Sequence, residues 1–158
     1  MKQLGWLLRL ELPSNPEILS VVRSAVTSLA KNMGFADEES RALTRAVDEA
    51  LANIICHAYD NRRGQPIEIL CRRIDAQPDS GEAPGLEIVL EDHGPAVDCK
   101  NFCGRPLDDV RPGGLGMHFI QSGVDLAEYS RRAWKNRLRL VKYLPTHDAK
   151  RTSAKGEQ

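Results

Sequence analysis

Hydrophobic residues recur with helical spacing in two stretches near the start of the chain. The earlier stretch runs from about Pro16 to Asn32, and Gly34 follows it as a typical helix end. The later stretch begins at Asp37, the expected N-cap, and continues to Tyr59. The positions that set the two periods are Ile18, Leu19, Val22, Val26, Leu29, Ala30 and Met33, and then Leu43, Ala46, Val47, Ala50, Leu51, Ile54, Ile55 and Ala58. The pattern therefore predicts two consecutive amphipathic helices.

Five other segments are apolar or alternate in the way that is typical of strands, and they span residues 6–12, 67–74, 86–91, 125–130 and 137–144. The breaker-rich residues 75–85 predict an exposed, mobile hairpin loop. Residues 94–112 predict a long loop of the kind that forms lids or binding elements, and a short helix should follow it. This order of elements predicts an α+β two-layer sandwich, with helices on one face of a mostly antiparallel sheet.

The composition limits the classes of partner. The 158 residues include 22 Lys and Arg and 22 Asp and Glu, so the formal net charge is zero, which argues against direct binding of nucleic acid or acidic membranes. No segment resembles a signal peptide or a spanning helix, so we expect a cytoplasmic protein. The length suits one domain, placed at residues 1–145, and the polar tail at 146–158 is expected to be disordered.

The second helix carries a polar row at the edge of its apolar face. At helical spacing, Arg45, Glu49, Asn53 and His57 fall on one stripe. A carboxylate, an amide and an imidazole in one row could line a binding site. The alternative for the row alone is a solvated face, and for His57 alone a hydrogen-bonded structural residue.

Two further motifs could contact a ligand. Asp92-His-Gly94 places a carboxylate and a flexible residue directly after a strand, although such a motif by itself also suits an ordinary turn. Gly113-Gly-Leu-Gly116 precedes a short helix, where free backbone N–H groups and the helix dipole favour phosphate oxygens. The same glycines could instead serve packing or a hinge. They form neither a P-loop nor a dinucleotide fingerprint.

Taken in order, Glu49-x-x-x-Asn53, Asp92-x-Gly94 and Gly113-Gly-x-Gly116 resemble the nucleotide-binding boxes of the histidine-kinase-like (GHKL) ATPase superfamily. The fuller segments 48–59, 92–98 and 113–120 are most similar to those of the anti-sigma-factor serine kinases. The resemblance spans about residues 5–144. It implies the Bergerat fold, with ATP and Mg²⁺ as cofactors.

The resemblance also implies a role for each matching residue. Glu49 would be the general base for a serine hydroxyl, and Asn53 would help to hold Mg²⁺. Asp92 would accept a hydrogen bond from the adenine amino group, and Gly94 would allow close approach of the base. The remaining nucleotide contacts would come from Val97, Gly113, Gly114, Gly116 and Met117, and residues 99–112 would form the lid.

The chain departs from the family pattern in the last box. Lys135 stands where the family has a glycine, and Asn136 follows where a Thr or Asn is usual, so an adenine-side contact there is not assigned. Arg105 and Arg111 are lid candidates for a γ-phosphate contact, and each also suits an exposed loop charge.

The cysteines do not indicate disulfides or a metal site. Cys56, Cys71, Cys99 and Cys103 are scattered over predicted helix, strand and loop, which predicts reduced thiols. Cys99 and Cys103 with His93 and His118 do not have the spacing of a familiar zinc site.

The function implied by the resemblance is an ATP-dependent serine/threonine protein kinase and anti-sigma regulatory factor. It would phosphorylate a serine of an anti-sigma-factor antagonist of the STAS type and would otherwise sequester a sigma factor. The alternative is a non-catalytic ATP-binding module that holds a protein partner without phosphorylating it, and Glu49 is the residue that favours the kinase. A homodimer is a further expectation from the family.

Overall fold

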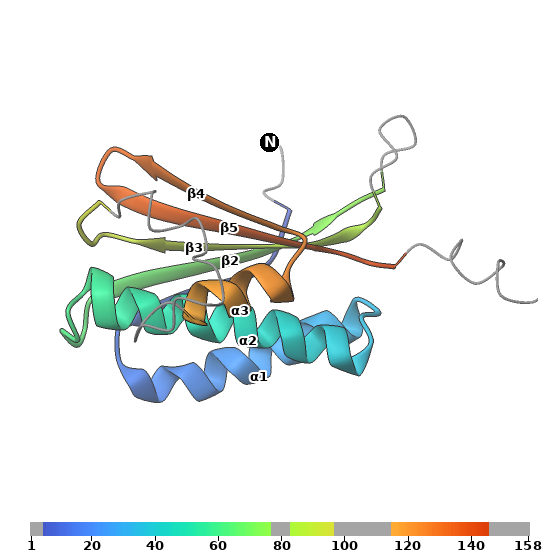
Figure 1. Cartoon of the computed structure of the whole chain (residues 1–158), viewed down its shortest axis with the longest axis horizontal. Helices are drawn as coiled ribbons and strands as arrows, with labels where there is room; N and C mark the ends of the chain where they lie inside the picture. Colours follow the sequence, from blue (N-terminus) through green and yellow to red (C-terminus); the bar gives the residue numbers. More distant parts are fainter. Residues whose placement is uncertain (1–4, 77–82, 97–114, 146–158) are drawn as a thin grey trace, which may run out of the picture.

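The computed structural model describes residues 5–76, 83–96 and 115–145, and a five-stranded sheet is their central element (Figure 1). The strands are β1 (Trp6–Pro13), β2 (Pro66–Ile74), β3 (Gly85–Asp92), β4 (Leu126–Arg132) and β5 (Lys135–Tyr143). They lie in the order β1-β2-β3-β5-β4, and each neighbouring pair is antiparallel. The predicted antiparallel sheet is confirmed.

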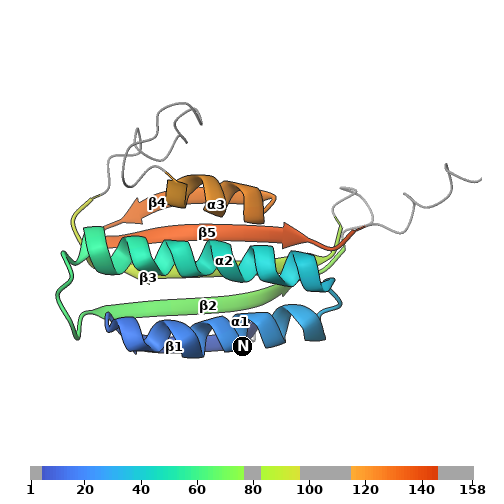
Figure 2. The same cartoon turned by 60° about the horizontal axis from the view of Figure 1, so that its bottom comes forward.

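The helices cover one face of this sheet, as predicted. A 3₁₀ turn, η1 (Pro16–Ile18), leads into α1 (Leu19–Asn32), and α2 (Asp37–Asn53) continues into a π-helical segment, η2 (Ile54–Ala58). The third helix is α3 (Leu115–Gly123). Figure 2 shows α2 lying between α1 and α3, above the middle of the sheet. The described residues therefore form the two-layer α+β sandwich expected from the pattern.

The start of α2 differs from the prediction by one residue. Ala36, with extended backbone at φ −64° and ψ 161°, is the N-cap, and Asp37 is the first residue of the helix. Glu39 reaches back and accepts a hydrogen bond from the Ala36 N–H at 3.0 Å. Lys31 pairs with Asp37 at 2.9 Å. Asp37 is therefore an acidic first-turn residue, favoured by the helix dipole, rather than the cap.

The core lies between α2 and the middle strands. Leu86, Ile88 and Leu90 alternate along β3 toward the helices, and all are essentially fully buried. They belong to one hydrophobic cluster with Leu43 and Leu51 of α2. Each such side chain contributes roughly 1.5–3 kcal/mol on burial. This packing fixes the polar edge of α2 relative to the end of β3.

Several predictions concern residues outside the described ones. Ile74 pairs with Gly85, which confirms that β2 and β3 form a hairpin, but residues 77–82 of its loop are not described. The predicted lid and the predicted disordered tail also lie outside the described residues. Within the described part of the chain, no helix combines the length and the hydrophobicity needed to cross a membrane.

Candidate functional site

Glu49 and Asn53 lie one turn apart on α2, at the edge of its buried face. Both residues are half-buried, between the buried Ala50 and Ile54 on one side and exposed positions on the other. Among the described residues, neither side chain has a hydrogen-bond or ion-pair partner. The helical spacing therefore presents a carboxylate and an amide that are both free to bind a ligand.

The polar row does not continue in the predicted way beyond Asn53. The helix widens into the π-helical segment η2, in which the Tyr59 N–H donates to the Ile54 carbonyl at 2.9 Å. A π turn holds more residues than an α turn, so the turn that carries His57 is wider than the α turn that the prediction assumed. His57 and Cys56 are exposed. Widened turns of this kind are frequent at functional sites.

Asp92 ends β3 on the side that faces the helices, and it is only 5% exposed. Its Oδ1 accepts hydrogen bonds from the side-chain amide of Asn136 and from the Gly94 N–H, each at 2.8 Å. Within the described residues, Oδ2 accepts no hydrogen bond. The carboxylate is thus held in place through one oxygen while the other oxygen can accept a ligand's N–H.

Asn136 connects the Asp92 segment to β4 and β5. It is 1% exposed, and its amide also donates to the Pro95 carbonyl at 3.0 Å. Its Oδ1 accepts hydrogen bonds from Tyr129 and Arg131, each at 2.5 Å. Asn136 stands where the family has a Thr or Asn, but spacing along the chain does not assign it a contact. The pairing of Asp92 with Asn136 across β3 and β5 brings the two side chains together.

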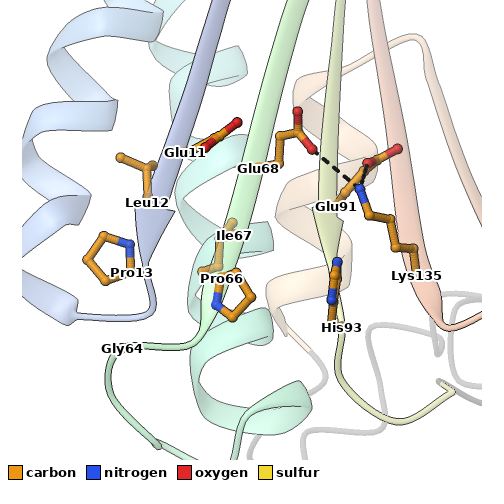
Figure 3. Close-up of a pocket in the computed structure, with 10 residues that line it drawn as sticks. All are labelled: Glu11, Leu12, Pro13, Gly64, Pro66, Ile67, Glu68, Glu91, His93 and Lys135. Atoms are coloured by element: carbon orange, nitrogen blue, oxygen red, sulfur yellow. Dashed lines mark hydrogen bonds and ion pairs between the residues drawn. The ribbon is translucent and has the colours of Figure 1, made fainter.

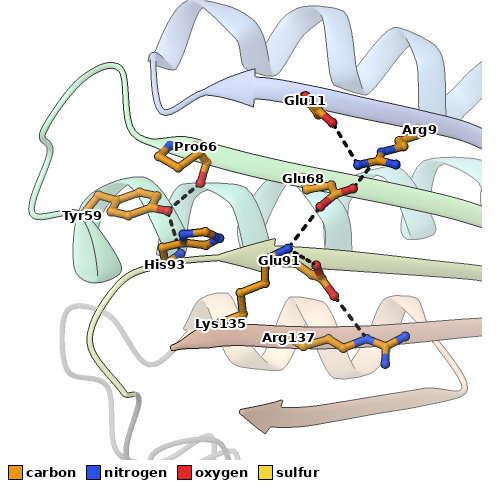
Figure 4. Close-up of polar contacts among 9 residues, drawn as sticks. All are labelled: Arg9, Glu11, Tyr59, Pro66, Glu68, Glu91, His93, Lys135 and Arg137. Atoms are coloured by element: carbon orange, nitrogen blue, oxygen red, sulfur yellow. Dashed lines mark hydrogen bonds and ion pairs between the residues drawn. The ribbon is translucent and has the colours of Figure 1, made fainter. Parts of the chain in front are cut away.

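Tyr59 fixes the other side of the Asp92 segment. Its hydroxyl donates to the Pro66 carbonyl at 2.5 Å and accepts from the His93 N–H at 2.8 Å, so it joins η2, β2 and β3 (Figure 4). Burial is the main cause that raises the pKa of Tyr59 above its usual value. The phenol therefore stays protonated and keeps both hydrogen bonds.

Gly94 brings the Asp92 segment into direct contact with the end of the α2–η2 helix. A Cβ at Gly94 would lie 2.7 Å from Ala58 Cβ and 2.8 Å from the Ala58 carbonyl oxygen. The missing side chain at Gly94 thus serves contact with the helix. Since Ala58 follows Asn53 on the same helical run, this contact ties the Asn53 end of the helix to Asp92.

The register of α3 on α2 brings the glycine box toward Glu49. Gly123 lies against Ala42, and Phe119 lies against Arg45, so the two helices run antiparallel. One more turn in this register places the N-terminal end of α3 at the level of Glu49. The positive end of the α3 dipole therefore points to the same region as the free carboxylate and amide.

The opposite face of the sheet carries a separate hollow of about 450 Å³ (Figure 3). Glu68, Glu91 and Lys135 line it, and the Lys135 ammonium pairs with Glu68 at 3.4 Å and with Glu91 at 3.0 Å. Hydrogen bonding to Glu91 is the main cause that raises the pKa of Lys135. Lys135, the residue at the family's glycine position, thus pairs with two glutamates on the open face, where its charge is neutralised (Figure 4). Successive residues of a strand point to opposite faces, so Asn136 and its partner Asp92 lie on the helix side.

The remaining candidate residues are divided between α3 and the part of the chain that is not described. Gly116 and Met117 belong to the first turns of α3. Val97, Gly113 and Gly114 lie outside the described residues, as do the lid candidates Arg105 and Arg111 and the cysteines at 99 and 103. Across residues 5–76, 83–96 and 115–145, no group of His, Cys, Asp and Glu is arranged to hold a metal ion without further ligands.

The arrangement has two chemically different ends. At one end, Asp92 offers a fixed hydrogen-bond acceptor beside a packed backbone, which suits a flat polar ring with an amino group. At the other end, Glu49 and Asn53 offer oxygen ligands and a base, which suit a hard divalent cation and a hydroxyl group. A phosphate chain between the two ends would satisfy both.

Comparison with known proteins identifies a family model, related sequences and a similar solved structure. Residues 12–142 match the family model of the histidine kinase-like ATPase domain. The serine-protein kinase RsbW of Bacillus pumilus is 28% identical over 130 residues, covering 77% of this chain and 76% of that protein. The protein of the same name from Oceanobacillus iheyensis is 30% identical over 129 residues, covering 75% of each. The crystal structure of the SiaB-SiaC complex from Pseudomonas aeruginosa has a similar fold, with a TM-score of 0.62 at 14% identity over 87% of this chain and 89% of that one.

Proposed function

Since this chain belongs to the histidine kinase-like ATPase domain family, we propose that it binds Mg·ATP between α2 and the Asp92 end of β3 and transfers the γ-phosphate to a serine of a partner protein. The observation that carries this proposal is a Glu49–Asn53 edge without partners among the described residues, together with a buried Asp92 of which one oxygen accepts no hydrogen bond from them. The two parts are joined through the contact of Gly94 with Ala58.

The adenine end rests on the fixed carboxylate. Asn136 and the Gly94 N–H orient Asp92 through Oδ1, so Oδ2 is ready to accept a hydrogen bond from the adenine amino group. Tyr59 holds the adjoining His93 backbone and limits movement of the segment. A preorganised acceptor of this kind selects adenine, because a base that presents a carbonyl there would face a second acceptor.

The phosphate end rests on the α2 edge and the start of α3. Asn53 would hold Mg²⁺ through its side-chain oxygen, and the ion would supply charge neutralisation at the phosphates. Glu49 would accept the proton of the attacking serine hydroxyl. The first turn of α3, with Gly116, would present backbone N–H groups to phosphate oxygens. Phosphoryl transfer then needs positioning and charge stabilisation more than covalent chemistry.

The expected protein substrate follows from the relatives. Two of them carry the name serine-protein kinase RsbW, and this chain is similar to each over most of its length. We therefore propose that the phosphate acceptor is the serine of an anti-sigma-factor antagonist of the STAS type. In the absence of the unphosphorylated antagonist, the protein would sequester a sigma factor.

Phosphate transfer from γ-labelled ATP to the cognate antagonist tests the proposal. We expect E49Q to lower the rate by about 10²-fold or more, the range that a general base contributes. D48N is the matched control, because Asp48 is the adjacent acid and is already paired with Arg23 at 2.9 Å. D48N should keep a rate close to that of the parent.

Two results would contradict the kinase. If E49Q transfers phosphate as fast as the parent, Glu49 is not the base. If the parent protein binds ATP but no candidate partner is phosphorylated, the chain is instead a binding module that holds its partner without modifying it.

A further inference from the structure

Arg45 begins the polar row on α2, yet it does not interact with the row. Its guanidinium carbon lies 3.7 Å from the centre of the Phe119 ring, in a cation–π contact between α2 and α3. Glu49 stands four residues further along α2, at the spacing where Arg and Glu commonly pair. No ion pair between Arg45 and Glu49 forms among the described residues.

Two other basic residues of the described helices, Arg23 and His118, do not pair with Glu49 either. Arg23 of α1 is bound to Asp48, the residue that precedes Glu49. His118 of α3 forms no ion pair with Glu49. Among the described residues, the carboxylate of Glu49 therefore has no ion-pair partner, although Arg45 stands one turn before it on α2.

The position of Phe119 follows from the close packing of α3 on α2. A Cβ at Gly123 would lie 2.5 Å from the Ala42 carbonyl oxygen and 3.0 Å from Ala46 Cβ, so this end of α3 touches the α2 backbone. Phe119 lies one turn earlier on the same side of α3 and meets Arg45, which lies one turn later than Ala42. The aromatic ring is thus held over the guanidinium by the helix pair itself.

Two interactions of similar strength compete for Arg45. A partly exposed cation–π contact and a surface ion pair at i and i+4 are comparable, and Arg placed N-terminal to Glu is the weaker orientation of such a pair. The ring can therefore decide which partner Arg45 takes. Loss of the ring should release the guanidinium toward Glu49.

We propose that Phe119 is a positioning residue that holds Arg45 away from Glu49 and so keeps the carboxylate free to act as a base. The role of Glu49 in this statement rests on the proposed kinase function, whereas the diversion of Arg45 does not. An internal salt bridge at Glu49 would stabilise the carboxylate and make it a weaker proton acceptor.

The position of Arg45, followed by nuclear Overhauser contacts in the full-length protein, tests the diversion directly. In the parent, the Arg45 guanidinium protons should contact the Phe119 ring. We expect F119L to replace these contacts by contacts between the Arg45 guanidinium protons and the Glu49 side chain, because the two residues stand at ion-pair spacing. F119Y keeps an aromatic ring and should show the contacts of the parent.

Phosphate transfer provides the second measurement. F119L should lower kcat by about twofold at unchanged KM for ATP, and R45Q/F119L should restore it. Thermal unfolding of each variant shows that the comparison is made on folded protein. A purely structural role of Phe119 would not be reversed by removing Arg45.

The outcomes separate this inference from the kinase proposal. An Arg45 guanidinium that makes no contact with Glu49 in F119L overturns the diversion of Arg45. This measurement needs neither ATP nor a protein partner. An absence of phosphate transfer together with the expected contacts would therefore count against the kinase alone.

Discussion

Strand β3 carries two buried carboxylates that the chain holds in opposite ways. Glu87 faces the open side of the sheet and is 0% exposed, and Arg72 and Arg139 both pair with it. Asp92 faces the helices, and its partners are the neutral amide of Asn136 and a backbone N–H. Among the described residues, one acid of this strand is thus bound by two cations and the other by none.

The difference shows which of the two acids can bind a ligand. Burial raises the pKa of Glu87, but the hydrogen bonds from Arg72 and Arg139 outweigh it, and the pKa lies below its usual value. The hydrogen bonds from both arginines reach Oε1, while Oε2 is buried against Arg72 and accepts no hydrogen bond from the described residues. Glu87 is therefore closed to a ligand by burial and serves to bridge β2, β3 and β5. Asp92 keeps an oxygen that no described residue uses, which is what a binding residue requires.

The largest expected effect is on ATP affinity, which should depend on Asp92 and hardly on Glu87. D92N keeps a side-chain oxygen for Asn136 and Gly94, but it replaces Oδ2 by an NH₂ group that cannot accept a hydrogen bond. We expect Mg·ATP to bind about 10- to 100-fold more weakly, the value of a hydrogen bond to a charged group. E87Q is the control on the same strand and should change the affinity less than about twofold. Isothermal titration calorimetry measures both, and equal losses would remove the distinction.

The second effect compares the glycines at the two ends of β3. A Cβ added at Gly94 would meet Ala58. A Cβ added at Gly85 would lie 2.5 Å from the Lys142 carbonyl oxygen. We expect G94A and G85A each to lower the free energy of unfolding by roughly 1–3 kcal/mol through overpacking. Only G94A should also weaken ATP binding, because it moves the Asp92 segment. Denaturant unfolding measures the stability of both variants, and calorimetry measures their ATP affinity. A loss of ATP affinity in G85A would contradict the prediction.

The smallest expected effect is on the free energy of unfolding, to which Glu87 should contribute in a pH-dependent way. E87Q should lower the free energy of unfolding at pH 7 by about 1–2 kcal/mol, less than for a fully buried pair because the Arg72 side chain is 48% exposed. The folded-state pKa of Glu87 is depressed, so its contribution is complete above the unfolded value of roughly 4.3 and is lost as the pH falls through the folded value.

Unfolding of the parent and E87Q at several pH values measures this contribution. The two proteins should differ fully at neutral pH and converge in acid. A difference that stays constant down to pH 3 would show that the effect is one of packing, because a lost charge interaction must disappear when the acid is protonated.

Much of the fold could be predicted because periodicity is a local property. The alternation in residues 86–91 gave β3 to within one residue at each end, and the apolar spacing around Leu43 and Val47 gave α2. The same spacing placed Glu49 and Asn53 together. It was wrong at Asp37, because Ala36 is the N-cap of α2. It also did not reveal that the last turn, Ile54–Ala58, is π-helical.

The contacts that organise the site could not be predicted from spacing, because they join residues far apart in the chain. Asn136 reaches Asp92 only through the register of β5 on β3, and Gly94 meets Ala58 only where the helix layer ends above the strand. Phe119 likewise reaches Arg45 only through the packing of α3 on α2.

The sequence by itself determined the elements, the α+β class and the candidate pair of Glu49 and Asn53, since each follows from residues within a few turns or one strand. The tertiary structure decided which polar groups are occupied and which are free. It binds Glu87 to two arginines, leaves one oxygen of Asp92 open and turns Arg45 toward Phe119. The physical reason is that the availability of a charged group depends on its neighbours in space, which only the packing of helices on the sheet brings together.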